Sequence, residues 1–415
     1  MNRSVVQRLT WLLFFGRSLG SAGYIAGATI GTIVGADLSG RPALAGVPGA
    51  MYLLGSAVAA YPAARLMERI GRRLGLALGF AVGIVGAVIC GLAILNRSFT
   101  GFLLGFTLMG VAQGFNDLGR YAAAEMHPVA ERARAISLVV LGGTVGAVLG
   151  PALVAPMGQL AEALHTDALA GPWFASAALF AIGAALMLFF LSPDPRDLSR
   201  LVEAEHAENS PTPIIDRLRP IGEIVSQSGT QLAIAAMALG QLVMVMVMAI
   251  TSLHMKHNHH GLGDVSFVIM LHTLGMFAPS IISGRLADRF GRAPTIIAGA
   301  ALLIAACLLA PLSLNTYILS AALFLLGIGW NFCYVAGGAL LTDTLSLAER
   351  GRMQGSIDLL VALISAAGNL GSGLVFAGFG YTAVAWASLA VTLVPLVIAF
   401  NFILGQGRVR VAEAE

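Results

Sequence analysis

The chain has 415 residues, of which 57% are hydrophobic and only 11% are charged, with a formal net charge of +3. So few charges cannot cover the surface of a soluble domain of this size, which excludes an ordinary soluble protein. The basic residues are spread among short loops, which excludes nucleic acid as a partner. Three cysteines, Cys90, Cys307 and Cys333, lie far apart within apolar runs, so neither a disulfide framework nor a zinc site is predicted.

Twelve apolar runs have the length that a membrane crossing requires, about 20 residues each. In chain order the predicted spans are 11–34, 43–63, 75–95, 99–120, 135–155, 172–191, 230–254, 265–283, 295–312, 316–340, 354–377 and 381–404. The first run is as long as the others and lacks a small-residue cleavage site, so we expect a membrane helix and not a removable signal peptide. The pattern predicts an all-α membrane protein.

Residues 192–229 form the one long polar stretch, and it opens with Ser192-Pro193-Asp194-Pro195. It predicts a connector between an N-terminal bundle, residues 1–191, and a C-terminal bundle, residues 230–415. If the N-terminus is cytoplasmic, 20 basic residues fall in cytoplasmic segments and three fall outside, namely Arg41, Arg97 and Lys256. Because basic residues favour the cytoplasmic side, both termini are predicted to be cytoplasmic.

Two loop segments of the first half recur in the second half. Residues 65–72 and 285–292 match as R-L-x-[D/E]-R-x-G-R, and residues 130–134 match residues 348–352. In both pairs the two copies are separated by about half of the chain. They fall in equivalent loops of a six-plus-six arrangement, as expected for parallel repeats. The repeats predict two six-helix bundles related by pseudo-two-fold symmetry.

The first repeated segment resembles the loop signature of the major facilitator superfamily, and the resemblance covers essentially the whole chain. It implies a transporter in which these charges form a latch that closes the two halves on the cytoplasmic side. The matching positions are Glu68, Arg69, Arg72, Asp288, Arg289 and Arg292. The alternative is that the charges only set the topology, although a topology signal needs no carboxylate or glycine at fixed offsets.

The seventh and eighth predicted spans carry sulfur and imidazole side chains at helical spacing. One stripe of span seven holds Met237, Gln241, Met244, Met248 and Met255, whose steps of four, three, four and seven keep them on one face. Span eight carries His272 and Met276 one turn apart. At about 1.5 Å per residue, adjacent antiparallel helices would place Met248 level with His272 and Met244 level with Met276.

Three thioethers and one imidazole favour Cu(I), and neither span contains a carboxylate to favour a hard cation. The pattern Met-x-x-x-Met followed by His-x-x-x-Met resembles that of CcoA-like copper importers, a bacterial branch of the superfamily. The resemblance implies that Met244, Met248, His272 and Met276 bind copper, which supplies assembly of cbb3-type cytochrome oxidase. The alternative is that the methionines only pack and that His272 has an unrelated polar role.

Two further groups of polar residues are candidates for function. The histidine-rich loop after span seven suggests metal capture, and the alternative is an ordinary solvent-exposed loop with no metal-binding role. Its residues are His254, Met255, His257, His259 and His260. Polar groups at membrane depth suggest a cavity or ion coupling, namely Arg17, Asp117, Asn331 and Asp358. For Asp117 the pattern leaves two partners open, Arg120 and Arg17.

We therefore expect a copper importer of the bacterial inner membrane that works by alternating access. The chain is expected to need no resident cofactor, to contact the lipid bilayer and to be a monomer. One alternative is an importer of a small organic solute such as riboflavin, and another is a non-transporting copper sensor or assembly factor. Enzyme activity is not expected, because the sequence shows no nucleotide loop, nucleophile triad or general acid–base pair.

Overall fold

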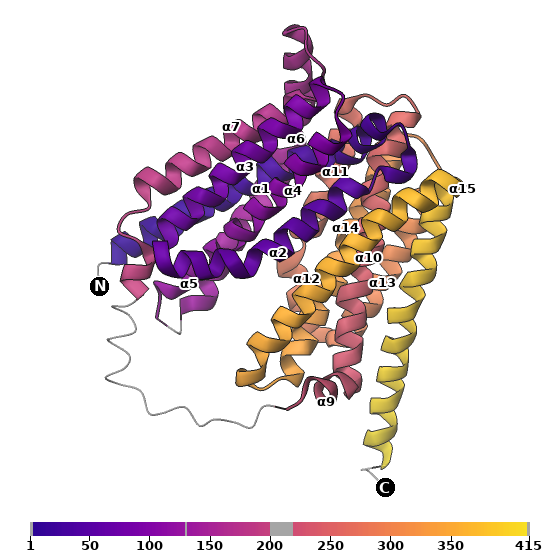
Figure 1. The fold of residues 1–415 in the computed structure, drawn as a ribbon. Helices are drawn as coiled ribbons and strands as arrows, with labels where there is room; N and C mark the ends of the chain where they lie inside the picture. The colour runs from indigo at the N-terminus through magenta and orange to yellow at the C-terminus, as the bar shows by residue number, and fades with distance from the viewer. Residues whose placement is uncertain (1–2, 129–130, 200–218, 413–415) are drawn as a thin grey trace. The chain divides into compact units, whose positions relative to one another are not determined.

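The computed structural model describes residues 3–128, 131–199 and 219–412, and these contain helices and turns but no strand. The first part of the chain forms α1 (Arg3–Ser39), η1 (Pro42–Leu44), α2 (Val47–Ile70), α3 (Arg72–Leu95), α4 (Phe99–Asp117), α5 (Gly119–Glu125), α6 (Arg132–Ala163), α7 (Gly171–Ala185) and the π-helical turn η3 (Leu186–Phe190) (Figure 1). The second part forms α9 (Ile221–Ser226), α10 (Ser228–His257), α11 (Leu262–Phe277), α12 (Ser280–Phe290), α13 (Arg292–Leu309), α14 (Thr316–Thr344) and α15 (Leu347–Ala412).

The predicted membrane spans fall on helices, although fewer than twelve helices qualify as separate spans. Within the described chain, nine helices are long and apolar enough to cross a membrane, and ten are if α11 and α12, which are bent by 40°, make one span. Helix α15 joins two helices across Gly380, whose φ is +78°. Each predicted span overlaps a helix, so the all-helical membrane fold is confirmed.

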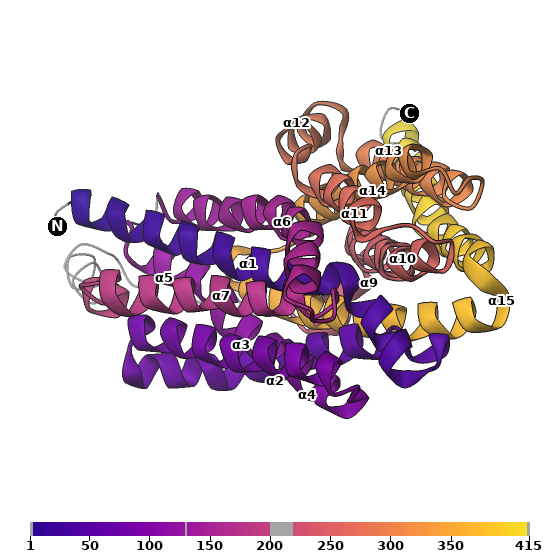
Figure 2. The ribbon, with the colours of Figure 1, turned by 90° about the horizontal axis from the view of Figure 1, so that it is seen from above.

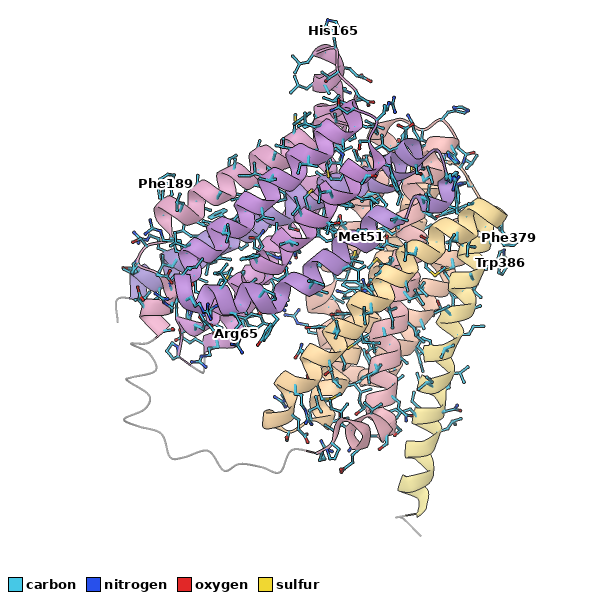
Figure 3. All side chains as sticks on the ribbon, in the orientation of Figure 1. Met51, Arg65, His165, Phe189, Phe379 and Trp386 are labelled. Carbon is cyan, nitrogen blue, oxygen red and sulfur yellow. The ribbon has the colours of Figure 1, made fainter. Side chains whose placement is uncertain are left out.

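The exposed side chains are those expected of a protein whose solvent is lipid. Phe189, Phe379 and Trp386 are 69%, 81% and 56% exposed, and Figure 3 shows all three pointing away from their helices. Large exposed apolar side chains of this kind would be costly in water, whereas hydrocarbon accepts them.

Contacts divide the chain into two compact units. The first unit holds residues Met1–Pro213 together with His260–Met270, and the second holds Ile214–His259 together with Leu271–Glu415. In the first unit α1 packs on α6 and α4 packs on both α2 and α3, and the helices run side by side in Figure 2. In the second unit α10 packs on α14 and α15, and α13 packs on α14. The predicted connector, residues 192–229, includes α9 and the start of α10, while its residues 200–218 lie outside the described chain.

The repeated loop has the same backbone conformation in both units. Gly71 joins α2 to α3 with φ and ψ of 94° and 165°, and Gly291 joins α12 to α13 with 99° and 160°. A positive φ favours glycine because a side chain would clash with the backbone. The glycine of the repeat is therefore required by the turn itself.

Close helix contacts repeat as well. A Cβ added at Gly55 of α2 would lie 2.5 Å from the Thr107 carbonyl oxygen of α4, and one added at Gly275 of α11 would lie 2.5 Å from that of Phe324 in α14. Gly110 of α4 packs on the carbonyl of an α2 residue in the same way as Gly327 of α14 packs on that of an α11 residue. Positions on α2 therefore correspond to positions on α11, counted from Gly55 and Gly275. Positions on α4 correspond to positions on α14, counted from Gly110 and Gly327.

The first helices of the two units correspond in the same manner. Gly20 of α1 faces Asn116, and its counterpart Gly240 of α10 faces Cys333. A second pair of glycines, on α6 and α15, packs on equivalent places of these helices: Gly150 faces Ala22, and Gly368 faces Leu242. Both comparisons give the same register between α1 and α10, so every side chain of α10 has a defined counterpart on α1.

Candidate functional site

The methionine stripe of α10 faces α14. Trp330 Nε1 donates a hydrogen bond of 2.6 Å to Gln241 Oε1, and a Cβ added at Gly337 would lie 2.9 Å from Met237 Cγ. The two helices are antiparallel, so a rise of about 1.5 Å per residue on each brings Met244 and Met248 level with the α14 segment 323–330. Met244 is buried and Met248 is half-buried.

His272 of α11 meets α14 over the same segment. Its imidazole is fully buried, and Nδ1 donates to the Leu323 carbonyl oxygen at 2.8 Å. Nε2 is buried and has no hydrogen-bond partner among the described residues. Met276 follows one turn later and is half-buried. A ring that gives one nitrogen to a backbone carbonyl and leaves the other free is the usual arrangement of a metal-ligating histidine.

The first unit shows what the equivalent positions do there. In the register set by Gly20 and Gly240, Tyr24 corresponds to Met244. In the register set by the glycines of α2 and α11, Tyr52 corresponds to His272. The two tyrosine rings are stacked, with centroids 3.9 Å apart and an interplanar angle of 12°. Tyr24 of α1 and Tyr52 of α2 are therefore in side-chain contact.

The histidine-rich segment at the end of α10 is engaged with α15. The His254 ring stacks on Tyr381 at 4.2 Å and 4°, and the His257 ring lies 5.6 Å from that of Phe376. Met255 is 1% exposed, whereas His257 and His259 are exposed. Across the described ranges, no three histidine, cysteine or acidic side chains gather closely enough to hold a metal. Metal capture by this segment, His260 included, stays a prediction.

The first unit contains an ion pair at membrane depth. Arg17 of α1 lies 2.5 Å from Asp117 of α4, and Gln113 donates to the same carboxylate at 2.9 Å. Of the two predicted partners, Asp117 therefore pairs with Arg17; Arg120 instead lies over the Tyr121 ring. Pairing offsets much of the cost of an isolated cation in the membrane.

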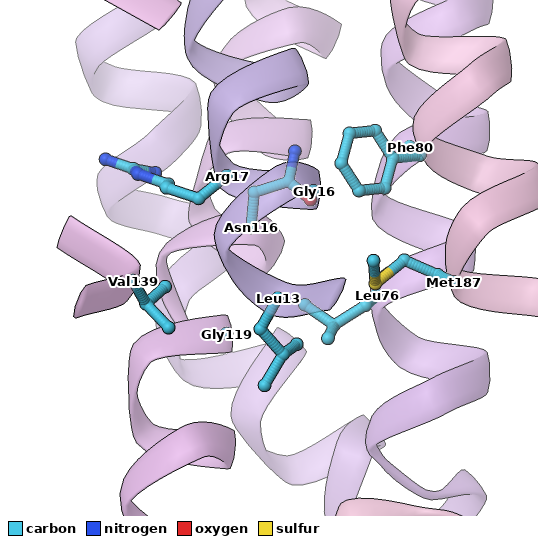
Figure 4. A pocket seen from close by; sticks show the side chains of 9 residues that line it. All are labelled: Leu13, Gly16, Arg17, Leu76, Phe80, Asn116, Gly119, Val139 and Met187. Carbon is cyan, nitrogen blue, oxygen red and sulfur yellow. The ribbon is translucent and has the colours of Figure 1, made fainter. Parts of the chain in front are cut away.

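A small cavity lies next to this ion pair (Figure 4). Its volume is about 10 Å³, at the lower limit for one water molecule. Its lining includes Arg17 and Asn116, and Asn116 Oδ1 is buried without a hydrogen-bond partner in the described chain. Most of the lining is apolar, and Arg17 and Asn116 are its polar residues.

The loop charges pair within each unit. Arg72 donates to Glu125 at 3.0 and 2.6 Å, and Arg292 donates to Asp343 at 3.1 Å and to Asp288. The acidic partners Glu125 and Asp343 are related by the same offset as the repeated segments 130–134 and 348–352, so the repeat itself would have revealed them. Sequence reasoning overlooked these two residues.

The remaining loop positions have separate surroundings. Glu68, Arg69 and Arg289 are exposed, and Arg196 donates to the Glu68 and Arg69 carbonyl oxygens at 3.1 Å. Of the other predicted cavity residues, Asp358 is half-buried and Asn331 is 2% exposed. Asn331 Nδ2 donates to the backbone of α11, and its expected part in a cavity or in ion coupling stays a prediction.

Two units of membrane helices with repeated loops and repeated glycine contacts define a multi-pass membrane transporter. The profile of the Major Facilitator Superfamily matches residues 10–265 and 232–414, and the chain belongs to this superfamily. The uncharacterized MFS-type transporter YddS of Bacillus subtilis (strain 168) is 38% identical over 93% of this chain and 89% of its own length. The riboflavin transporter RfnT of Brucella anthropi is 31% identical over 93% of this chain and 94% of its own.

Solved structures share the fold. A bacterial homolog of the human lysosomal transporter Spinster, in an inward-facing and occupied conformation, matches with a TM-score of 0.71 at 15% identity over 98% of both chains. The human organic anion transporter MFSD10 matches with a TM-score of 0.61 at 17% identity, over 95% of this chain and 99% of that one. At these identities the likeness concerns the fold alone.

Proposed function

We propose that this chain is a copper importer of the bacterial inner membrane that carries Cu(I) as its substrate. Met244, Met248, His272 and Met276 bind the ion. The observation that carries the proposal is the fully buried His272 ring, whose Nε2 has no hydrogen-bond partner in the described part of the chain. Leaving a buried polar nitrogen unmatched costs about 1–3 kcal/mol, and a bound soft ion would offset that cost.

The surroundings of the ring support a soft ion as the occupant. The hydrogen bond from Nδ1 to Leu323 fixes the tautomer, so Nε2 keeps its lone pair. Neutral thioethers favour Cu(I) over hard cations. The tyrosines stacked at the equivalent positions of the first unit support close approach of Met244 to His272.

The rest of the transport cycle is proposed on the same basis. Both termini are cytoplasmic, and the two units expose the site alternately to each side. The repeated loop charges act as the cytoplasmic gate. The pair of Arg17 and Asp117 is the candidate for coupling to protons. Ionisable residues within membrane helices usually have a function, and these two form an ion pair between α1 and α4. Imported copper serves oxidase assembly.

Radiocopper uptake tests the proposal in cells that lack their own importer. His272→Ala and Met244→Ala are expected to lower uptake by at least about tenfold, since loss of even an outer-shell partner costs about 10–100-fold in metal affinity. Met246→Ala is the matched control, because Met246 lies on the same helix but off the stripe. Normal uptake by the first two variants, at equal amounts in the membrane, would overturn the site.

A second candidate function, riboflavin import, is favoured by a specific observation. The Trp330 and Tyr334 rings are stacked at 5.0 Å beside Gln241, an arrangement suited to a planar aromatic solute. The relative RfnT, named as a riboflavin transporter, supports this candidate. Riboflavin uptake that is lost in Trp330→Ala but unchanged in Met244→Ala would favour it over copper.

A further inference from the structure

Helix α11 is interrupted one residue after Met276. It ends at Phe277, and α12 begins at Ser280 with a bend of 40° between them. Pro279 has no N–H and cannot donate to the carbonyl four residues earlier. In the first unit the equivalent residue is Ala59, and α2 runs without interruption from Val47 to Ile70. The interruption therefore belongs to the unit that carries the methionines and His272.

Asn331 of α14 bridges this interruption. Its Nδ2 donates to the Met276 carbonyl oxygen at 2.7 Å and to Ser280 Oγ at 2.8 Å, and Ser280 Oγ donates to the Phe277 carbonyl at 2.8 Å. A primary amide has two N–H groups, so one side chain serves both acceptors. It satisfies a carbonyl at the end of α11 and attaches the first residue of α12.

The first unit shows that this bridge is not a requirement of the helix contact. The position equivalent to Asn331 is Gly114, and a Cβ added there would lie 2.8 Å from the carbonyl oxygen of Ser56. Ser56 is in turn the counterpart of Met276. A glycine is therefore enough to pack the two helices, and the asparagine appears where the helix is interrupted next to a thioether.

We propose that Asn331 is a positioning residue for the copper site, a proposal that rests on the function proposed above. His272 is fixed one turn earlier by the Leu323 carbonyl and by the backbone contact at Gly327. Met276 lies one residue before the end of α11, where Asn331 fixes the backbone that carries the thioether. Asn331 thus determines whether the Met276 thioether and the His272 imidazole reach the same ion.

X-ray absorption of the purified full-length protein loaded with Cu(I) tests the proposal by counting sulfur ligands. Wild-type protein is expected to show three sulfurs and one nitrogen. Asn331→Ala is expected to lose one sulfur, as Met276→Ala does, and to bind Cu(I) about tenfold more weakly, the lower end for loss of a supporting contact. Asn369→Ala is the matched control, because Asn369 donates only within its own helix at 3.1 Å in the described contacts.

Each outcome bears on the proposal. An unchanged sulfur count and affinity in Asn331→Ala would overturn the positioning role while leaving the copper site intact. Wild-type protein that binds no Cu(I) would overturn the site and the positioning role together. If Asn331→Ala does not fold, Ser280→Ala removes one of the two acceptors and leaves the asparagine in place. That variant is expected to show an intermediate loss of affinity, and wild-type affinity would overturn the role.

Discussion

The two units place different chemistry on one backbone frame. Gly55 and Gly110 of the first unit correspond to Gly275 and Gly327 of the second, and all four pack against a neighbouring helix backbone. At the positions that this frame defines, the first unit has Tyr24, Ala28, Tyr52 and Ser56, and the second has Met244, Met248, His272 and Met276. The glycine contacts therefore set a common frame, on which the two units present different side chains.

The distribution of charge differs in the same way. Arg17 and Asp117 form an ion pair in the first unit, and their counterparts in the second are the uncharged Met237 and Tyr334. A positive charge near a copper site would repel the ion. At the position equivalent to Arg17 the second unit has the uncharged Met237, so no positive charge stands there.

Loss of a glycine contact that both units share should lower the yield of folded protein severely. Gly110→Ala and Gly327→Ala each place a Cβ against a carbonyl oxygen, so both are expected to abolish or sharply lower the yield of folded protein. Gly338→Ala is the control, because an added Cβ there meets no atom within 4 Å. Size-exclusion profiles of fluorescent fusions measure the yield. Normal yield for either of the first two variants would contradict the shared frame.

An intermediate effect is expected from removing the charge that distinguishes the first unit. Arg17→Met installs the residue of the second unit and leaves Asp117 without its cation, so the melting temperature should fall by several degrees. Arg17→Met with Asp117→Asn should recover most of that loss, because replacing both members of an ion pair costs less than breaking it. Thermal melts in detergent measure both variants. A double variant no more stable than the single one would show that the pair does not matter for stability.

In the second repeated loop, substitutions should change the melting temperature only slightly. Glu349 is 1% exposed and accepts from the Arg219 guanidinium at 2.9 and 2.7 Å, whereas its repeat partner Glu131 is exposed. The Arg219 guanidinium, followed by the Ser346 N–H, holds the pKa of Glu349 well below its ordinary value near 4.5. Glu349→Gln should therefore lower the melting temperature at neutral pH, and Glu131→Gln should leave it unchanged.

The stability contributed by the Glu349 carboxylate should depend on pH. A carboxylate with a lowered pKa contributes stability above its unfolded pKa and loses that contribution as the pH falls through the folded pKa. The difference between wild-type protein and Glu349→Gln should stay constant from about pH 7 down to about 4.5 and shrink below it. Melts across this range provide the measurement. A difference that grows on acidification would show that Glu349 is protonated in the folded protein.

Much of the fold was predictable because apolar runs and repeated loops are local patterns. The helical spacing of Met244 and Met248, and of His272 and Met276, was visible for the same reason. The partners of these residues were not predictable, because a contact between helices leaves no mark at fixed spacing. His272 donates to the backbone carbonyl of Leu323. Every residue has such a carbonyl, so the residue type at position 323 could not indicate this contact.

A polar residue within an apolar run has more than one possible use. Asn331 suggested a cavity or ion coupling, which stays a prediction, and its Nδ2 donates to the backbone of α11 and to Ser280. Only the pairing of α14 with α11 and α12 shows this, since the two partners are 55 and 51 residues distant in the chain. By contrast, the partner of Asp117 was among the two considered, and the distance of 2.5 Å from Arg17 decides between them.

Helix α14 contacts α10 through Trp330 and Gly337, and it contacts α11 through Leu323, Gly327 and Asn331. A single residue inserted between Leu323 and Trp330 would rotate everything beyond it by about 100° around the helix axis. Both sets of contacts would then fall out of register at once. Side chains along this stretch can therefore be substituted one at a time, whereas a change in its length would disrupt the contacts with α10 and with α11 together.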